Sequence, residues 1–186
     1  LTGDQDLTLT LKGSTKGFTV DATGFEAKLD VTGSDSQDTI KLGAEGGTVT
    51  ASGDADQIIL GAGVDKTVYT TLTASLATAH DTLAGFISGT DKIVVSSAQA
   101  IAIAGTGGFV TASVTGTGTL ADDLVTAFTS EGMIANGATV VTITGGDDAG
   151  TYLVLNDNTQ AFNASLDAVI HLTSTTAIVA GDFVAG

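Results

Sequence analysis

Aspartates recur among glycines between residues 33 and 68, and their carboxylates are the groups in this sequence best suited to bind a metal ion. The segment divides into four blocks of nine residues, GSDSQDTIK, LGAEGGTVT, ASGDADQII and LGAGVDKTV. The sixth position of the blocks reads Asp38, Gly47, Asp56 and Asp65. Oxygen ligands suit a hard cation, and Ca²⁺ accepts carboxylates together with backbone carbonyls. The pattern therefore predicts calcium as the cofactor.

The nine-residue period also predicts how these aspartates are positioned. The blocks approximate the nonapeptide G-G-x-G-x-D-x-U-x, in which small residues allow a tight turn and the following residues form a short strand. The eighth position points inward and reads Ile40, Val49, Ile58 and Thr67, with Val68 replacing Thr67 after a slip of one residue. Two blocks make one coil of a parallel β-solenoid, or β-roll.

Residues eighteen apart then stack on the same edge of the solenoid. Asp38 and Asp56 share one edge, whereas Asp65 shares the other edge with a glycine, which offers no side chain. We expect one calcium row through Asp38 and Asp56 and a poorer site near Asp65. The neighbouring Asp35 and Asp54 would serve as auxiliary ligands.

Turn chemistry alone offers a second interpretation of the same residues. Gly and Asp are also favoured in ordinary turns, so a metal-free β-solenoid would select a similar pattern. Only the block that begins at residue 60, LGAGVD, keeps glycine at both expected places. The calcium-binding solenoid and the bare solenoid both stay open at this point.

A second motif follows the repeats and carries the most specific likeness to a known family. It reads D-x-L-x-x-F-x-x-G-x-D-x-I and consists of Asp81, Leu83, Phe86, Gly89, Asp91 and Ile93. With this motif the chain resembles RTX-type proteins exported by type I secretion systems, and within them S-layer and adhesin surface proteins. The opening residues 1–10 and the segments 151–157 and 167–172 share the resemblance. The motif adds Asp81 and Asp91 to the predicted calcium ligands.

The resemblance implies a structural role outside the cell. Such a chain would leave the cell unfolded through the type I secretion machinery and fold at the cell surface on binding calcium. Its partners would be other copies in a surface lattice or upstream domains of the same protein, of which this chain would be a C-terminal piece. Two alternatives stay open, namely the C-terminal secretion module of an extracellular protease or lipase, and an adhesin that binds carbohydrate.

The chain is expected to divide near residue 97 into a solenoid, 1–96, and a C-terminal α+β region, 97–186. Apolar residues alternate with polar ones before the repeats, which predicts strands there. Residues 97–118 suggest short strands with flexible turns, and 119–131 predict one helix, capped by Thr119 and Asp122. Strands at 139–144, 151–155 and 168–173 would form a small antiparallel sheet on this helix. The fold class is thus mainly β, with the sheet and helix capping the solenoid. The last residues, 181–186, suit either a secretion signal or a final edge strand.

Composition excludes several kinds of function. The net charge is −15, the six basic residues are all lysines, and arginine and cysteine are absent. Phosphate binding needs clustered basic residues, so nucleic acid is not an expected partner. No apolar run approaches the roughly 20 residues of a spanning helix, so membrane insertion is not expected. Metalloprotease, lipase and P-loop motifs are missing, and the histidines, His80 and His171, stand alone. We therefore expect no catalytic residues.

Overall fold

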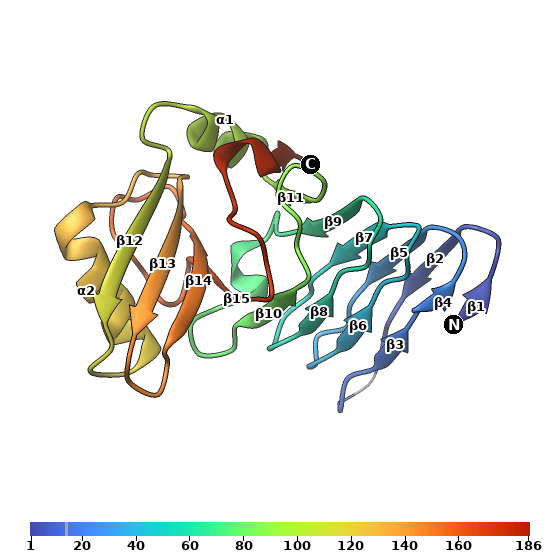
Figure 1. The fold of residues 1–186 in the computed structure, drawn as a ribbon. Helices are drawn as coiled ribbons and strands as arrows, with labels where there is room; N and C mark the ends of the chain where they lie inside the picture. The colour runs from blue at the N-terminus through green and yellow to red at the C-terminus, as the bar shows by residue number, and fades with distance from the viewer. Residues whose placement is uncertain (14) are drawn as a thin grey trace.

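The computed structural model describes residues 1–13 and 15–186, in which two facing β-sheets are joined by a series of stacked coils (Figure 1). The six-stranded sheet contains, in spatial order, β16 (Phe183–Ala185), β11 (Lys92–Val95), β9 (Asp65–Val68), β7 (Gly47–Thr50), β5 (Leu29–Thr32) and β2 (Leu7–Thr10). The eight-stranded sheet contains β12 (Phe109–Thr115), β13 (Ala138–Thr144), β14 (Gly150–Leu155), β15 (Ala168–Thr173), β10 (Asp81–Ala84), β8 (Gln57–Ile59), β6 (Thr39–Lys41) and β3 (Thr19–Asp21).

Up to residue 95 the chain alternates between the two sheets, and neighbouring strands within each sheet are parallel. Thr39 pairs with Gln57 in one sheet and Gly47 pairs with Asp65 in the other, so residues eighteen apart stack. The mainly β class is thereby confirmed. A short pair, β1 (Thr2–Gly3) with β4 (Gly24–Phe25), adds to the N-terminal end of the coils.

The slip of one residue predicted at Val68 is wrong. Thr67 pairs with Val49 and is fully buried, whereas Val68 is only half-buried. The parallel hydrogen bonds with β7 fix the register, and a shift by one residue would turn every side chain of β9 to the other face. The strand therefore keeps its register and buries a threonine.

Inward-facing apolar side chains form one row per sheet between the two layers. Ile40, Ile58 and Leu83 lie on one side and Val49 and Ile93 on the other, all fully buried. The alternation of buried and exposed residues along each strand is the period of two that places successive side chains on opposite faces. This row gives the coils their core.

The C-terminal part differs from the small separate cap that the sequence predicted. β15 pairs in parallel with β10 and antiparallel with β14, so the strands after residue 137 extend the eight-stranded sheet. β14 is also antiparallel to β13, but β12 is parallel to β13. β16 likewise extends the six-stranded sheet by pairing with β11. The sheet that was expected to be antiparallel and independent is mixed and continuous with the coils.

Two α-helices flank these strands, where the sequence predicted one. The expected helix is α2 (Leu120–Glu131), whose first turn has the predicted capping box of Thr119 and Asp122. Leu124 and Phe128 pack over the outer face of the sheet. The second helix, α1 (Ser97–Ala104), lies where short strands were expected, because Ser96 and Gln99 form another capping box ahead of an alanine-rich turn.

Two single-turn 3₁₀ segments complete the elements, η1 (Leu72–Ala74) and η2 (Ala180–Asp182). The boundary predicted between residues 96 and 97 falls between β11 and α1, and the division into two domains stays a prediction. Within the part of the chain that is described, no helix is long and apolar enough to cross a membrane.

Substitution of Leu83 tests how much the apolar core between the two sheets contributes to stability. Its side chain is fully buried, so Leu83→Ala should leave a cavity and lower the free energy of unfolding by about 2–5 kcal/mol. Val64 is 61% exposed, so Val64→Ala should change it by less than about 0.5 kcal/mol. Urea unfolding followed by circular dichroism measures both, and equal effects of the two variants would contradict the assignment of the core.

Candidate metal-binding site

A row of buried aspartates joins successive coils along one edge of the eight-stranded sheet. The N–H of Phe18 donates to Asp38 Oδ1 at 2.7 Å, the N–H of Asp38 donates to Asp56 Oδ1 at 2.8 Å, and the N–H of Asp56 donates to Asp81 Oδ1 at 2.9 Å. Each carboxylate thus accepts a bond from the coil before it. Asp38, Asp56 and Asp81 are at most 2% exposed.

A second row follows the edge of the six-stranded sheet. The N–H of Asp65 donates to Asp91 Oδ1 at 3.0 Å, and both carboxylates are fully buried. The other oxygen of each aspartate accepts a bond from its own turn, four residues earlier. Gly61 N–H donates to Asp65 Oδ2 at 2.8 Å and Ile87 N–H donates to Asp91 Oδ2 at 2.7 Å. Each aspartate therefore fixes two things: the turn that begins four residues before it, and the contact of its coil with the neighbouring coil.

Three buried carboxylate oxygens in these rows make no hydrogen bond of good geometry: Asp56 Oδ2, Asp65 Oδ1 and Asp81 Oδ2. Weaker contacts reach these carboxylates from Ser52 N–H to Asp56, from Gly47 N–H to Asp65 and from the Tyr69 hydroxyl to Asp81. A buried acceptor without a partner is costly, and native proteins rarely leave one without a reason such as a bound ion. The Tyr69 hydroxyl lies close to Asp81 and also lacks a partner of good geometry. A cation bound at these atoms would offset the free-energy cost of burying them.

Gly33 lies beside the carboxylates of two successive coils. A Cβ atom at this residue would lie 3.1 Å from Asp38 Oδ2 and 3.6 Å from Asp56 Oδ2. The space that a side chain would fill is therefore lined by oxygens of two aspartates in successive coils. Oxygen donors alone fit calcium, with backbone carbonyls of the turns completing the shell. Among the described residues no three carboxylates or histidines converge on one point, so carbonyl ligands would be essential.

Burial also shifts the pKa values of these carboxyl groups. Burial, followed by the charge of Asp38, raises the pKa of Asp56 to about 7. Burial and the charge of Asp56 raise the pKa of Asp81 to about 7, and burial and the charge of Asp91 raise the pKa of Asp65 to about 6. The backbone N–H donors partly offset the burial. Neutralising these groups is thus favourable, whether by a proton or by a cation.

Asp35 and Asp54, predicted as auxiliary ligands, lie apart from the buried rows. Both are exposed at the turns, and Asp54 accepts a bond from the N–H of Ala55 at 3.0 Å. Asp54 contributes only a smaller part of the charge that raises the pKa of Asp56. The predicted ligands Asp38, Asp56, Asp65, Asp81 and Asp91 occupy the corners, and their binding of calcium stays a prediction.

Two buried aspartates of the same kind were missed by the sequence interpretation. Asp167 accepts bonds from Asn163 N–H, four residues earlier, at 2.7 Å and from Asp157 N–H at 2.8 Å. It precedes β15 as Asp91 precedes β11, and the run of Asp followed by Ala-Val-Ile could have signalled it. Burial and then the charge of Asp157 raise the pKa of Asp167.

Asp182 is the second missed residue and fixes the C-terminal segment to the loop before β11. It accepts bonds from the Ser88 hydroxyl at 2.7 Å and from Gly89 N–H at 2.8 Å, and Lys92 Nζ lies 3.8 Å away. Burial alone would raise the pKa of Asp182, but these donors together hold it below its usual value. This carboxylate is therefore stabilised by groups of the chain itself, among them the ammonium group of Lys92.

The two histidines lie outside these rows and form no catalytic triad. Tyr152 and His171 stack with ring centroids 4.8 Å apart, and His80 lies 6.0 Å from His171. Burial, and then the charge of His80, lowers the pKa of His171. His80 thus lies in the loop before β10 and His171 lies on β15, and both belong to this aromatic cluster.

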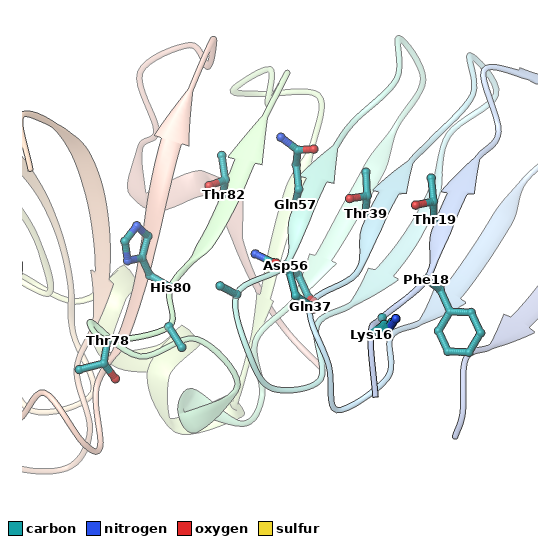
Figure 2. A pocket seen from close by; sticks show the side chains of 13 residues that line it. Lys16, Phe18, Thr19, Gln37, Thr39, Asp56, Gln57, Thr78, His80 and Thr82 are labelled. Atoms are coloured by element: carbon teal, nitrogen blue, oxygen red, sulfur yellow. The ribbon is translucent and has the colours of Figure 1, made fainter. Parts of the chain in front are cut away.

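A groove of about 580 Å³ runs beside His80 over the outer face of the eight-stranded sheet. Figure 2 shows Thr19, Thr39, Gln57 and Thr82 in a row along it, each from a successive strand. The row follows the parallel register of β3, β6, β8 and β10. The groove is therefore lined by repeating polar groups, and the buried Asp56 reaches it from the corner.

Parallel coils closed by stacked aspartate corners define a β-roll of the RTX class. The family model described as Peptidase M10 serralysin C terminal matches residues 26–121, which include the four blocks and the motif that ends at Ile93. The chain belongs to this family, whose members are type I-secreted, calcium-binding β-rolls and form the non-catalytic C-terminal part of M10 peptidases. Membership implies export from the cell. No curated protein matches the chain.

Coil spacing depends on Gly61 at the start of the last block. A Cβ atom there would lie 1.7 Å from the carbonyl oxygen of Gly43, in the coil before. Gly61→Ala should force the coils apart and lower the free energy of unfolding by about 3 kcal/mol or more. Gly181 has open space around it, so Gly181→Ala is the matched control in thermal melts. A harmless Gly61→Ala would contradict the close stacking.

The raised pKa values predict an unusual pH dependence of the metal-free protein. Protonated Asp56, Asp65 and Asp81 stabilise the fold below their unfolded pKa near 3.8, and this contribution is lost as the pH rises through about 6 to 7. In chelator, stability should fall by at least about 4 kcal/mol between about pH 4 and pH 8, the equivalent of one carboxyl group whose pKa moves from 3.8 to about 7. Thermal melts across this range measure it, and Asp56→Asn should flatten the curve. A stability that rises with pH would exclude this explanation.

Proposed function

We propose that this chain is a structural, calcium-dependent domain of an exported surface-layer or adhesin protein, which folds outside the cell and takes part in assembling or anchoring a surface coat. One observation carries the proposal: buried carboxylates are stacked at the corners of the coils, and those of Asp56, Asp65 and Asp81 each keep an oxygen without a hydrogen bond of good geometry. A bound cation would compensate the negative charge of these buried carboxylates.

The residues that would hold calcium are those of the two corner rows. Asp38 and Asp56 would hold it at Gly33, Asp81 would extend this row, and Asp65 and Asp91 would form the second row. A bound ion supplies positive charge that lets adjacent coils keep their carboxylates ionised. The aspartates themselves orient the turns by accepting N–H bonds from both coils.

Mass action then couples folding to the place where calcium is abundant. At a concentration ten times the dissociation constant, each ion that binds only the folded state adds about 1.4 kcal/mol. Extracellular modules commonly bind calcium at roughly 10⁻⁴ to 10⁻³ M. The chain would stay loose in the cytosol, where it can pass the type I secretion machinery, and become ordered outside.

Family membership favours a second function, the secretion module of an extracellular protease or lipase. The matched family is the C-terminal part of M10 peptidases, and this chain itself has no metalloprotease motif. The intact exported polypeptide distinguishes the two. A zinc-protease or lipase sequence ahead of Leu1 would support the secretion module, and further Thr- and Gly-rich solenoid would support the coat protein.

The groove in Figure 2 supports a third function, the binding of a carbohydrate by an adhesin. Its hydroxyl and amide groups repeat from strand to strand, and Phe18 and His80 stand at its opposite ends. Tryptophan is absent and only two tyrosines occur, so aromatic platforms for sugar rings are few. We therefore rank this function below the structural one.

Circular dichroism with calcium and then with a chelator tests the proposal. The β-sheet signal and the thermal transition should appear with calcium and be lost in chelator at neutral pH. Asp56→Asn should require at least about tenfold more calcium, because it removes one buried charged ligand. Asp30→Asn removes an equal charge from an exposed site on β5 and should leave the titration unchanged. Identical folding in chelator would remove calcium from the function.

A further inference from the structure

The strand β12 is the outer strand of the eight-stranded sheet and pairs on one side only, with β13. It is seven residues long, from Phe109 to Thr115, and alternates between half-buried and exposed residues. Thr111, Ser113 and Thr115 are exposed, whereas Ala112 and Val114 pack against the cluster under α2. The strand is thus held by its inner neighbour, α2 packs across one of its faces, and no described strand pairs with its outer edge (Figure 1).

The hydrogen bonds at the two ends of β12 show which backbone groups face the open edge. The carbonyl of Gly108 accepts from Ala138 N–H at 2.9 Å, and Gly116 N–H donates to the carbonyl of Thr144 at 3.1 Å. Bonding alternates along a parallel strand, so even-numbered residues bond to β13. The N–H and carbonyl groups of residues 109, 111, 113 and 115 therefore point outward.

Charge distinguishes this edge from the other edges of the two sheets. Residues 93–121 contain no Asp, Glu, Lys, Arg or His in a chain whose net charge is −15. The other edge strands are shorter and carry charges at or beside them: β2 follows Asp6, β3 ends at Asp21 and β16 follows Asp182. Natural edge strands are commonly protected by charge, proline or a bulge, and β12 has none of these in its sequence.

We infer that β12 is a self-association surface, on which β12 of a second copy adds antiparallel to join the two eight-stranded sheets. This inference rests on the proposed coat-forming function and names the surface through which two copies meet. A twofold axis at Ala112 places Thr111 opposite Ser113 of the second copy, and Phe109 opposite Thr115. All outward-facing backbone groups of one strand then meet those of the other.

A second copy fits this edge better than an unrelated strand for two physical reasons. Two chains of charge −15 repel one another over most of their surfaces, and the uncharged stretch is where that repulsion is smallest. A twofold contact is also self-complementary, because each strand presents the same four outward residues in reverse order. The side chains that flank the axis, Thr111, Ala112 and Ser113, are small and do not obstruct close approach.

Proline at the outward-facing positions tests the inference without breaking the sheet. Ser113→Pro removes only an N–H that faces the open edge, so the bonds to β13 persist. Thr8→Pro is the matched control, because Leu7 and Leu11 donate their N–H groups to β5 and the N–H of Thr8 faces the opposite open edge. Sedimentation velocity in calcium, from about 10 to about 300 µM, covers the affinity expected of so small an interface.

The unmodified chain and Thr8→Pro should form a dimer, and Ser113→Pro should remain a monomer at concentrations at least tenfold higher. A monomeric unmodified chain, or dimerisation by Ser113→Pro, would overturn the inference. Loss of dimerisation by Thr8→Pro alone would assign the contact to the N-terminal end of the coils instead. Circular dichroism of the same samples, with and without calcium, separates this result from the proposed function. A chain that folds without calcium yet dimerises through β12 would refute only the calcium dependence.

Discussion

The structure depends on one repeated interaction, the hydrogen bond from a backbone N–H in one coil to an aspartate carboxylate in the next. The bonds from Phe18 to Asp38, from Asp38 to Asp56 and from Asp56 to Asp81 set the distance between coils. The same carboxylates must be buried to make these bonds, so the interaction that stacks the coils also concentrates negative charge. Stability and the proposed metal affinity would therefore have a common origin.

That origin explains the unusual composition. A protein without cysteine or proline cannot hold an extracellular fold by disulfides or stiffened turns. Its stability must come from the short rows of apolar side chains between the sheets and from neutralisation of the corners. Asp182 shows the alternative solution, because hydroxyl and N–H donors and the ammonium group of Lys92 surround that carboxylate.

The C-terminal strands pair with the strand edges at the end of the coils. β15 covers the edge of β10 and β16 covers the edge of β11, so both sheets of the roll continue into the last third of the chain. The exposed end of the eight-stranded sheet is thereby moved from the acidic corners to the uncharged strand β12. The chain thus separates the region proposed to bind a cation from the edge strand proposed to meet a second copy.

The sequence by itself determined the coil period, the aspartates at the corners, the helix α2 and the motif from Asp81 to Ile93, because spacing and capping are local properties. Even Asp167, which was missed, follows the same local pattern. The helix α1 was missed although its capping box of Ser96 and Gln99 is also a local signal. Only the tertiary structure decided that Thr67 keeps its register and that β15 pairs with β10. It also decided which carboxylate oxygens lack a hydrogen bond of good geometry. Strand pairing and burial depend on residues far apart in the chain. A local repeat pattern does not specify which of these distant segments lie side by side.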